Sequence, residues 1–278
     1  IIRVPPSWVW LKIHTDTELF GLGEPYLENH PESVIAEVQR LEPMLVGKDP
    51  CQVEEMWQLM YQGGSGYVGG PVKMSAISGI DIALWDILGK SVGLPLCDLL
   101  GGKVRDSIRA YNTCAGYSYV QTKSTQGTTN FGLDAKQGRY EDLQGFLTRA
   151  DEVAESLLEM GITAMKIWPF DYAAEKTGGQ FISSEDLGKC LAPFEKIRKA
   201  VGDRIDIMAE LHSLWNRPMA TRIARELEQF KLLWVEDPVT MDHMDSIGEV
   251  ARSTRSPMES MWSIVTGSST HSSLNCSS

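Results

Sequence analysis

The stretch IMAELHSLWN, residues 207–216, decides the fold because it begins as a buried strand and then turns polar. Its first three residues are apolar, and Glu210 and His212 follow two positions apart. Side chains two residues apart on a β-strand point to the same face of the sheet. The stretch therefore predicts a strand that directs a carboxylate and an imidazole toward one place.

The sequence on either side of this stretch alternates between helical and strand patterns. A helical pattern at about 145–160 precedes AMKIWPF, EDLGKCLAPFEKIRKAVG precedes IDIMAELHS, and PMATRIARELEQFK precedes LLWVEDPV, after which HMDSIGEVARST begins another helix. Repeated strand–helix units of this length predict a parallel sheet. Eight such units close a (β/α)₈ barrel, and this sequence supplies about four of them.

Ionisable side chains occur where these strands are predicted to end. Lys166 lies in the first strand pattern, and Glu210 and His212 end the second. The third strand pattern ends in Glu236 and Asp237. Barrel enzymes carry their catalytic residues at the C-terminal ends of their strands. The sequence therefore predicts a functional site at this edge of the sheet.

Residues 1–105 predict a separate α+β domain. WVWLKI (8–13) is typical of a strand, and Gly21 and Gly23 in the following LFGLGEPY indicate a turn or bulge. Two amphipathic helical patterns follow, and the segment 73–92 is apolar around most of its circumference, which is typical of a buried helix. The predicted organisation is this domain, a half-barrel at 106–255 and an aberrant serine-rich tail at 256–278.

The composition argues against several classes of protein. The net charge is −11 and the pI about 5.0, without clustered Lys or Arg, which disfavours nucleic-acid binding. No apolar run approaches the roughly 20 residues of a transmembrane helix, and the N-terminus lacks the pattern of a signal peptide. The five cysteines are scattered without a CxxC pair, which is typical of free thiols in a reducing compartment. We therefore expect a cytoplasmic protein that binds neither nucleic acid nor membrane.

Five stretches together resemble the enolase superfamily, in its mandelate racemase and muconate lactonizing branch and nearest to its sugar-acid dehydratases. They are GLGEP (21–25), GIDIALWDILGKSVGLPLCDLLGG (79–102), MKIWPF (165–170), AELH (209–212) and WVEDPV (234–239). The resemblance extends over about residues 8–255. It implies an α/β fold, with an α+β capping domain followed by an incomplete (β/α)₈ TIM-type barrel.

The family resemblance also implies a chemistry, the metal-assisted removal of the proton next to a carboxylate. Mg²⁺, held by three carboxylates, stabilises the resulting enediolate. The first two ligand positions match Glu210 and Glu236, which are 236 − 210 = 26 residues apart, or one strand–helix unit. The third is expected one unit later, where the sequence has Trp262, and the nearest carboxylate, Glu259, is out of step with the repeat.

Four further side chains take roles from the same resemblance. Lys166 matches the first lysine of the family's Lys-x-Lys motif, which supports the substrate carboxylate or the second lysine. Trp168 stands at the second position, where the usual general base is found. Trp168 therefore disfavours a racemase, and we expect it to line the substrate pocket. His212 resembles the dehydratase histidine that protonates the departing hydroxide. Tyr26 and Asp237 are expected beside the substrate, with Asp237 orienting a neighbour.

The function implied is a lyase, a Mg²⁺-dependent dehydratase that removes water from an aldonate, with a small-molecule carboxylate as substrate and a homo-oligomeric full-length parent. Residues 256–278 contain nine serines and no continuing strand–helix alternation. We therefore expect a C-terminally truncated chain that also lacks the first strand of the capping domain and has little or no activity. Two alternatives stay open: a racemase or epimerase of hydroxy acids, and a non-catalytic binding fragment.

Overall fold

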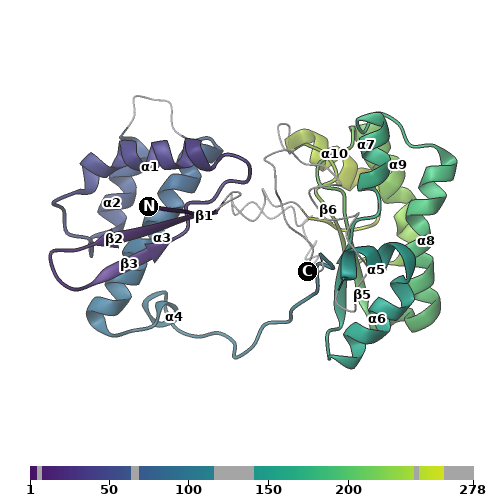
Figure 1. Cartoon of the computed structure of the whole chain (residues 1–278), viewed down its shortest axis with the longest axis horizontal. Coiled ribbons are helices and arrows are strands. Elements are labelled where there is room, and N and C mark those ends of the chain that lie inside the picture. Colours follow the sequence, from purple (N-terminus) through teal and green to yellow (C-terminus); the bar gives the residue numbers. More distant parts are fainter. Residues whose placement is uncertain (5–7, 64–68, 116–140, 241–243, 260–278) are drawn as a thin grey trace, which may run out of the picture. The chain divides into compact units, whose positions relative to one another are not determined.

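The computed structural model describes residues 1–4, 8–63, 69–115, 141–240 and 244–259. Among these residues the chain divides into two compact units, the first ending at Ile108 and the second beginning at Arg109 (Figure 1). Each unit has its own hydrophobic core. In the described parts of the chain, no helix is long and apolar enough to cross a membrane.

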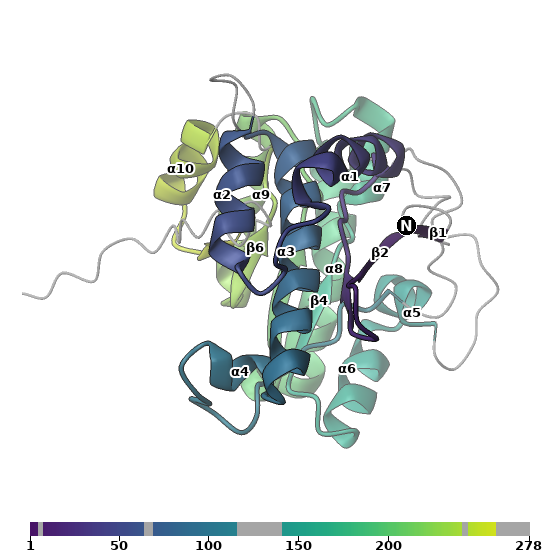
Figure 2. The same cartoon turned by 90° about the vertical axis from the view of Figure 1, so that its left-hand side faces the viewer.

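The first unit is an antiparallel sheet with helices packed on one face. Its described residues form strands β1 (Ile2–Val4), β2 (Trp8–His14) and β3 (Phe20–Gly23), paired in that order, and helices α1 (Pro31–Leu45), α2 (Val53–Gln62), α3 (Pro71–Val92) and α4 (Leu96–Leu99). Alternation along β2 buries Val9 and Leu11 and exposes Trp8 and Trp10, as expected for a sheet covered on one face. Helix α3 packs against β2 and β3 (Figure 2). It buries nine of its 22 residues, so the predicted burial holds for one side only, and Ile82 on the other side is 52% exposed.

The turn or bulge predicted at Gly21 and Gly23 is wrong, because both residues lie inside β3. They pair with Ile13 and Leu11 of β2 and face helix α3. A Cβ atom on Gly23 would overlap the carbonyl oxygen of Gly79 in α3, and one on Gly21 would overlap the next turn of the same helix. The glycines are therefore needed because a strand backbone lies directly against a helix backbone.

We expect the substitution Gly23→Ala to destabilise the first unit by about 2–4 kcal/mol, because the added methyl group meets backbone that cannot move independently. Urea unfolding followed by circular dichroism measures the effect. Gly188→Ala is the control, because its Cβ would enter open space within a helix, and it should be neutral or stabilise by up to about 1 kcal/mol. Equal stability of Gly23→Ala and the unmodified protein would refute the close approach.

The second unit is a parallel sheet whose strands follow one another in sequence order. Its described strands are β4 (Ala164–Ile167), β5 (Asp206–Glu210), β6 (Trp234–Glu236) and β7 (Met258–Glu259), and its helices are α5 (Asp142–Thr148), α6 (Ala150–Glu159), α7 (Asp171–Thr177), α8 (Ser184–Val201), α9 (Arg217–Leu227) and α10 (Met244–Ser253). Doubly wound sheets reverse their strand order, whereas barrels do not. The order β4-β5-β6-β7 with helical crossovers is therefore that of a (β/α)₈ barrel, as predicted.

Alternate strand residues divide between the core and the site. Met165 and Ile167 of β4, Ile207 of β5 and Val235 of β6 pack with the helices in the core of the unit. The intervening positions point to the opposite face of the sheet. Lys166, Glu210 and Glu236 occupy such positions, so the packing of the helices determines which way these polar side chains point.

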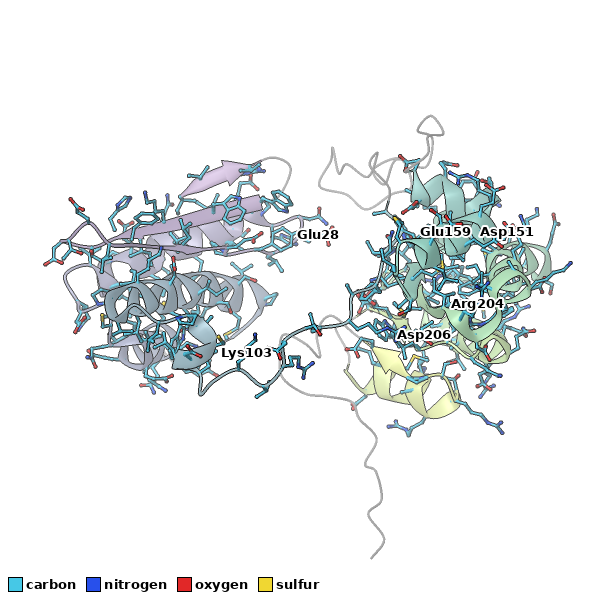
Figure 3. The ribbon with its side chains drawn as sticks, turned by 90° about the horizontal axis from the view of Figure 1, so that it is seen from below. Glu28, Lys103, Asp151, Glu159, Arg204 and Asp206 are labelled. Carbon is cyan, nitrogen blue, oxygen red and sulfur yellow. The ribbon has the colours of Figure 1, made fainter. Side chains whose placement is uncertain are left out.

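Two sets of contacts attach the segment before β4 to the sheet. Within DSIRAYNTC (106–114), strand pairing is limited to one bridge, in which Asn112 pairs with Met165. Just before β4, the Arg109 guanidinium donates to Asp206 Oδ2 at 2.6 Å and to the Thr163 carbonyl at 2.7 Å. Asp206, labelled in Figure 3, is the first residue of β5. Arg109 thus links this segment to β5 and to the residue that precedes β4.

Three other expectations differ from the structure. The single helix expected at 145–160 is two helices, because Arg149 leaves helical geometry with φ −139° and ψ 50°. Helix α7 follows β4 without having been predicted. Strand β7 lies within the segment where no further strand was expected, and it pairs with β6 in parallel.

Candidate functional site

Three glutamates lie at the same level on neighbouring strands. Glu210 of β5 pairs in register with Glu236 of β6, and Glu236 pairs in turn with Glu259 of β7. Residues that pair across parallel strands point to the same face. The expectation that Glu259 is out of step with the repeat is therefore wrong, since the register of β7 aligns it with both predicted metal ligands.

Lys166 joins Glu210 and Glu236 through a single ammonium group. Its Nζ atom donates to Glu210 Oε2 at 2.9 Å and to Glu236 Oε1 at 2.6 Å. The three side chains are between 4% and 10% exposed, so the contacts are shielded from water. The structure thus brings together three of the predicted site residues, with two carboxylates converging on one cation.

The remaining oxygen of each carboxylate is held by a different donor. The backbone N–H of His212 donates to Glu210 Oε1 at 2.9 Å, and the indole N–H of Trp234 donates to Glu236 Oε2 at 2.8 Å. Both carboxylates are therefore oriented at both oxygens. Sequence reasoning missed Trp234, although its position two residues before Glu236 carries the same spacing signal as Glu210 and His212.

Burial and mutual charge shift the pKa values of this cluster. Burial, followed by repulsion from Glu210, raises the pKa of Glu236 above its ordinary value. Burial alone would lower the pKa of Lys166, but attraction to Glu210 and the contact with Glu236 outweigh it, so the pKa is raised. Lys166 is therefore a permanent cation near neutral pH, facing two acidic groups.

A second ion pair lies beside the first. His212 Nδ1 is 2.7 Å from Asp171 Oδ2, and the His212 ring meets the Trp168 ring edge-on with centroids 5.0 Å apart. Asp171 is nearly inaccessible, and its Oδ1 atom has no hydrogen-bond partner among the described residues. Sequence reasoning missed Asp171, which is the first residue of α7, and the available signal was an acidic residue shortly after the strand AMKI.

The backbone at His212 departs from the extended geometry assumed in the sequence. Strand β5 ends at Glu210, and His212 has a left-handed φ of 49°. The ring consequently reaches Asp171 rather than continuing the alternation of the strand. Burial would lower the pKa of His212, but the charge of Asp171 and the hydrogen bond to it prevail and raise the pKa to about 9. Because Nδ1 is engaged by Asp171, any proton exchange with a substrate must use Nε2.

The three predicted substrate contacts have different positions. Trp168 is buried, and its indole N–H donates to the Thr113 carbonyl at 3.2 Å, so it forms part of the wall beside His212. Asp237 is buried just after β6, where its carbonyl accepts from the Ser213 N–H at 2.8 Å. Tyr26 is partly buried in the first unit. These roles in substrate binding stay predictions.

The donor set of Glu210 and Glu236 fits Mg²⁺ in its chemistry. Mg²⁺ prefers oxygen ligands and commonly binds through one or two carboxylates together with waters. The two carboxylates already converge on a cation, the Lys166 ammonium. No group of three acidic, histidine or cysteine side chains gathers at a metal-binding distance within the described ranges. Trp262, at the expected third position, lies outside those ranges.

Comparison with known families and proteins identifies consistent relatives. Residues 4–101 match the N-terminal domain of mandelate racemase and muconate lactonizing enzyme, and residues 148–270 match the enolase C-terminal domain-like family. D-galactonate dehydratase of Verminephrobacter eiseniae is 33% identical over 262 residues, and that of Klebsiella pneumoniae is 34% identical over 256. Each alignment covers 92% of this chain, and the chain spans only 58% of the length of these relatives.

Solved structures agree with this result. An enolase of the mandelate racemase subgroup from Agrobacterium tumefaciens is 41% identical, with a TM-score of 0.72 over 91% of this chain and 59% of that one. An enolase protein from Sargasso Sea environmental sequencing is 34% identical, with a TM-score of 0.76 over 93% of this chain and 62% of that one. Both similarities extend over both units of the fold.

Proposed function

This chain belongs to the mandelate racemase and muconate lactonizing branch of the enolase superfamily, and we propose that its site serves the Mg²⁺-dependent dehydration of a sugar acid. The observation that carries the proposal is the pair of buried carboxylates, Glu210 and Glu236, converging on one cation beside a histidine–aspartate pair. The curated relatives named D-galactonate dehydratase support an aldonate as the substrate class.

Glu210 and Glu236 would hold the metal, with their outer oxygens fixed by the His212 and Trp234 donors. A bound Mg²⁺ would supply positive charge that stabilises the carboxylate of the substrate as a general base, which cannot be Trp168, takes the neighbouring proton. The protein's own share is orientation, because each glutamate is already constrained at both oxygens before any metal binds.

His212 is suited to protonate the hydroxide that leaves. Asp171 holds its Nδ1 side, and the raised pKa keeps the ring protonated at neutral pH. The proton on Nε2 would then pass to the departing oxygen, giving water. Trp168 supports dehydration over racemisation, since its buried indole, bonded to the Thr113 carbonyl, supplies no general base.

The test is incubation of the purified chain with Mg²⁺ and a panel of aldonates in D₂O, followed by proton NMR. Loss of water should give a 2-keto-3-deoxy acid, which would contradict the expectation of little or no activity, and Glu236→Gln should lower its rate by about a hundredfold or more. Glu185→Gln, an exposed residue of α8, is the control and should keep the full rate. Exchange of the α-proton without loss of water would identify a racemase or epimerase, and neither reaction would overturn the proposal.

A further inference from the structure

The geometry points to Lys166 as an internal cation that occupies the metal position until Mg²⁺ displaces it, so that metal binding releases the lysine for the carboxylate of the substrate. The inference rests on the proposed function and adds an order of events to it. Mg²⁺ would bind first and displace Lys166 from the glutamates, and the displaced lysine would then contact the substrate.

The position of the ammonium group carries the first step. Lys166 Nζ lies 2.9 Å from Glu210 Oε2 and 2.6 Å from Glu236 Oε1, so it contacts one oxygen of each carboxylate. The other oxygen of each carboxylate already accepts a hydrogen bond, from the His212 backbone N–H and the Trp234 indole N–H. Mg²⁺ binds carboxylate oxygens at about 2.0–2.1 Å. An ion bound to Glu210 Oε2 and Glu236 Oε1 would therefore take the place of the ammonium group.

Charge carries the second step. Two carboxylates and one ammonium leave the buried cluster with a charge of −1, which favours a further cation. Mg²⁺ in contact with both carboxylates would change that charge to +1 if the ammonium group stayed, and two like charges at close range in a buried site repel strongly. The repulsion drives the ammonium group out of the cluster, which leaves the two carboxylates and Mg²⁺ with no net charge and makes the ammonium group available to an anionic substrate.

The ring of Tyr111 lies within reach of the Lys166 ammonium group. The four-carbon chain of the lysine is flexible, and the ring of Tyr111, which is 42% exposed, has its centroid 5.8 Å from Nζ. Tyr111 in turn meets the Trp234 ring edge-on with centroids 5.7 Å apart. An ammonium group over an aromatic face is favourable, and Nζ is already within range of the Tyr111 ring, so a shift toward this partly exposed ring would take the ammonium group off the carboxylates.

The first experiment compares Mg²⁺ affinities by calorimetry on metal-free protein. Lys166→Met should bind Mg²⁺ about tenfold more tightly than the unmodified protein, because the competing cation is gone. Lys189→Met is the matched control, since Lys189 also contacts a glutamate at 2.6 Å but on the exposed surface of α8, and its Mg²⁺ affinity should not change.

The second experiment uses the unmodified protein, so it does not depend on the folding of a variant. The side-chain ¹⁵N resonance of Lys166, assigned through its loss in Lys166→Arg, should shift during Mg²⁺ titration with the same apparent affinity as calorimetry. Mg²⁺ binding with an unmoved lysine signal, or with unchanged affinity in Lys166→Met, overturns the displacement alone. Absence of Mg²⁺ binding to every protein tested overturns the metal site of the proposed function and the displacement together.

Discussion

The substitution Lys166→Met is expected to destabilise the metal-free protein by about 3–5 kcal/mol, because it leaves two buried carboxylates without their common cation. Methionine keeps most of the side-chain volume, so the loss is one of charge rather than of packing. Urea unfolding at neutral pH measures the change. Lys189→Met, on the exposed surface, should leave the stability of the protein unchanged.

A second substitution separates charge from other causes. Adding Glu236→Gln to Lys166→Met should restore much of the lost stability, because one of the two opposing charges is removed. The defect of Lys166→Met should also shrink as the pH falls, since the raised pKa of Glu236 lets this carboxyl accept a proton first. A Lys166→Met defect under about 1 kcal/mol, or one that is independent of pH, would contradict the idea that the cluster depends on this ammonium group.

The sequence predicted those features that depend on local pattern. The parallel order of β4 to β7 follows from alternating strand and helix periods, and Glu210 and Glu236 follow from their places at strand ends. Glycine is ambiguous in a sequence, because close backbone approach and a turn both require it. The prediction at Gly21 and Gly23 is wrong for that reason, since the backbone of α3 that meets them, at Ala83 and Gly79, lies more than 50 residues away in sequence.

The site was only partly predictable because its support comes from contacts distant in sequence. Asp171 is separated from His212 by 41 residues, and the two meet only because β4 and β5 are neighbours. The left-handed backbone at His212 carries no sequence signal as strong as a glycine would. Glu259 was judged against the length of the repeat, whereas strand pairing determines its level.

The substitution Asp171→Asn is expected to lower the pKa of His212 from about 9 to below its ordinary 6.5 in the metal-free protein. Burial of the ring disfavours its charged form, and the Asp171 carboxylate is the chief group that reverses this effect. Proton–carbon NMR of the His212 ring, assigned through its loss in His212→Asn, follows the titration. Asp203→Asn, which alters an exposed carboxylate in the same unit, is the control and should leave the His212 titration unchanged.

The same substitution should change how stability depends on pH. The pKa of His212 is raised above its unfolded value of 6.5, so its contribution is fully present below pH 6.5 and is lost as the pH rises toward 9. Between these limits the unmodified protein should lose up to about 3 kcal/mol that Asp171→Asn does not lose. Burial raises the pKa of Asp171, and Asp171→Asn removes that carboxyl, so the comparison reports on the His212–Asp171 pair as a unit. Parallel stability curves for the two proteins from pH 6 to 9 would show that the 2.7 Å contact does not hold a charged imidazole.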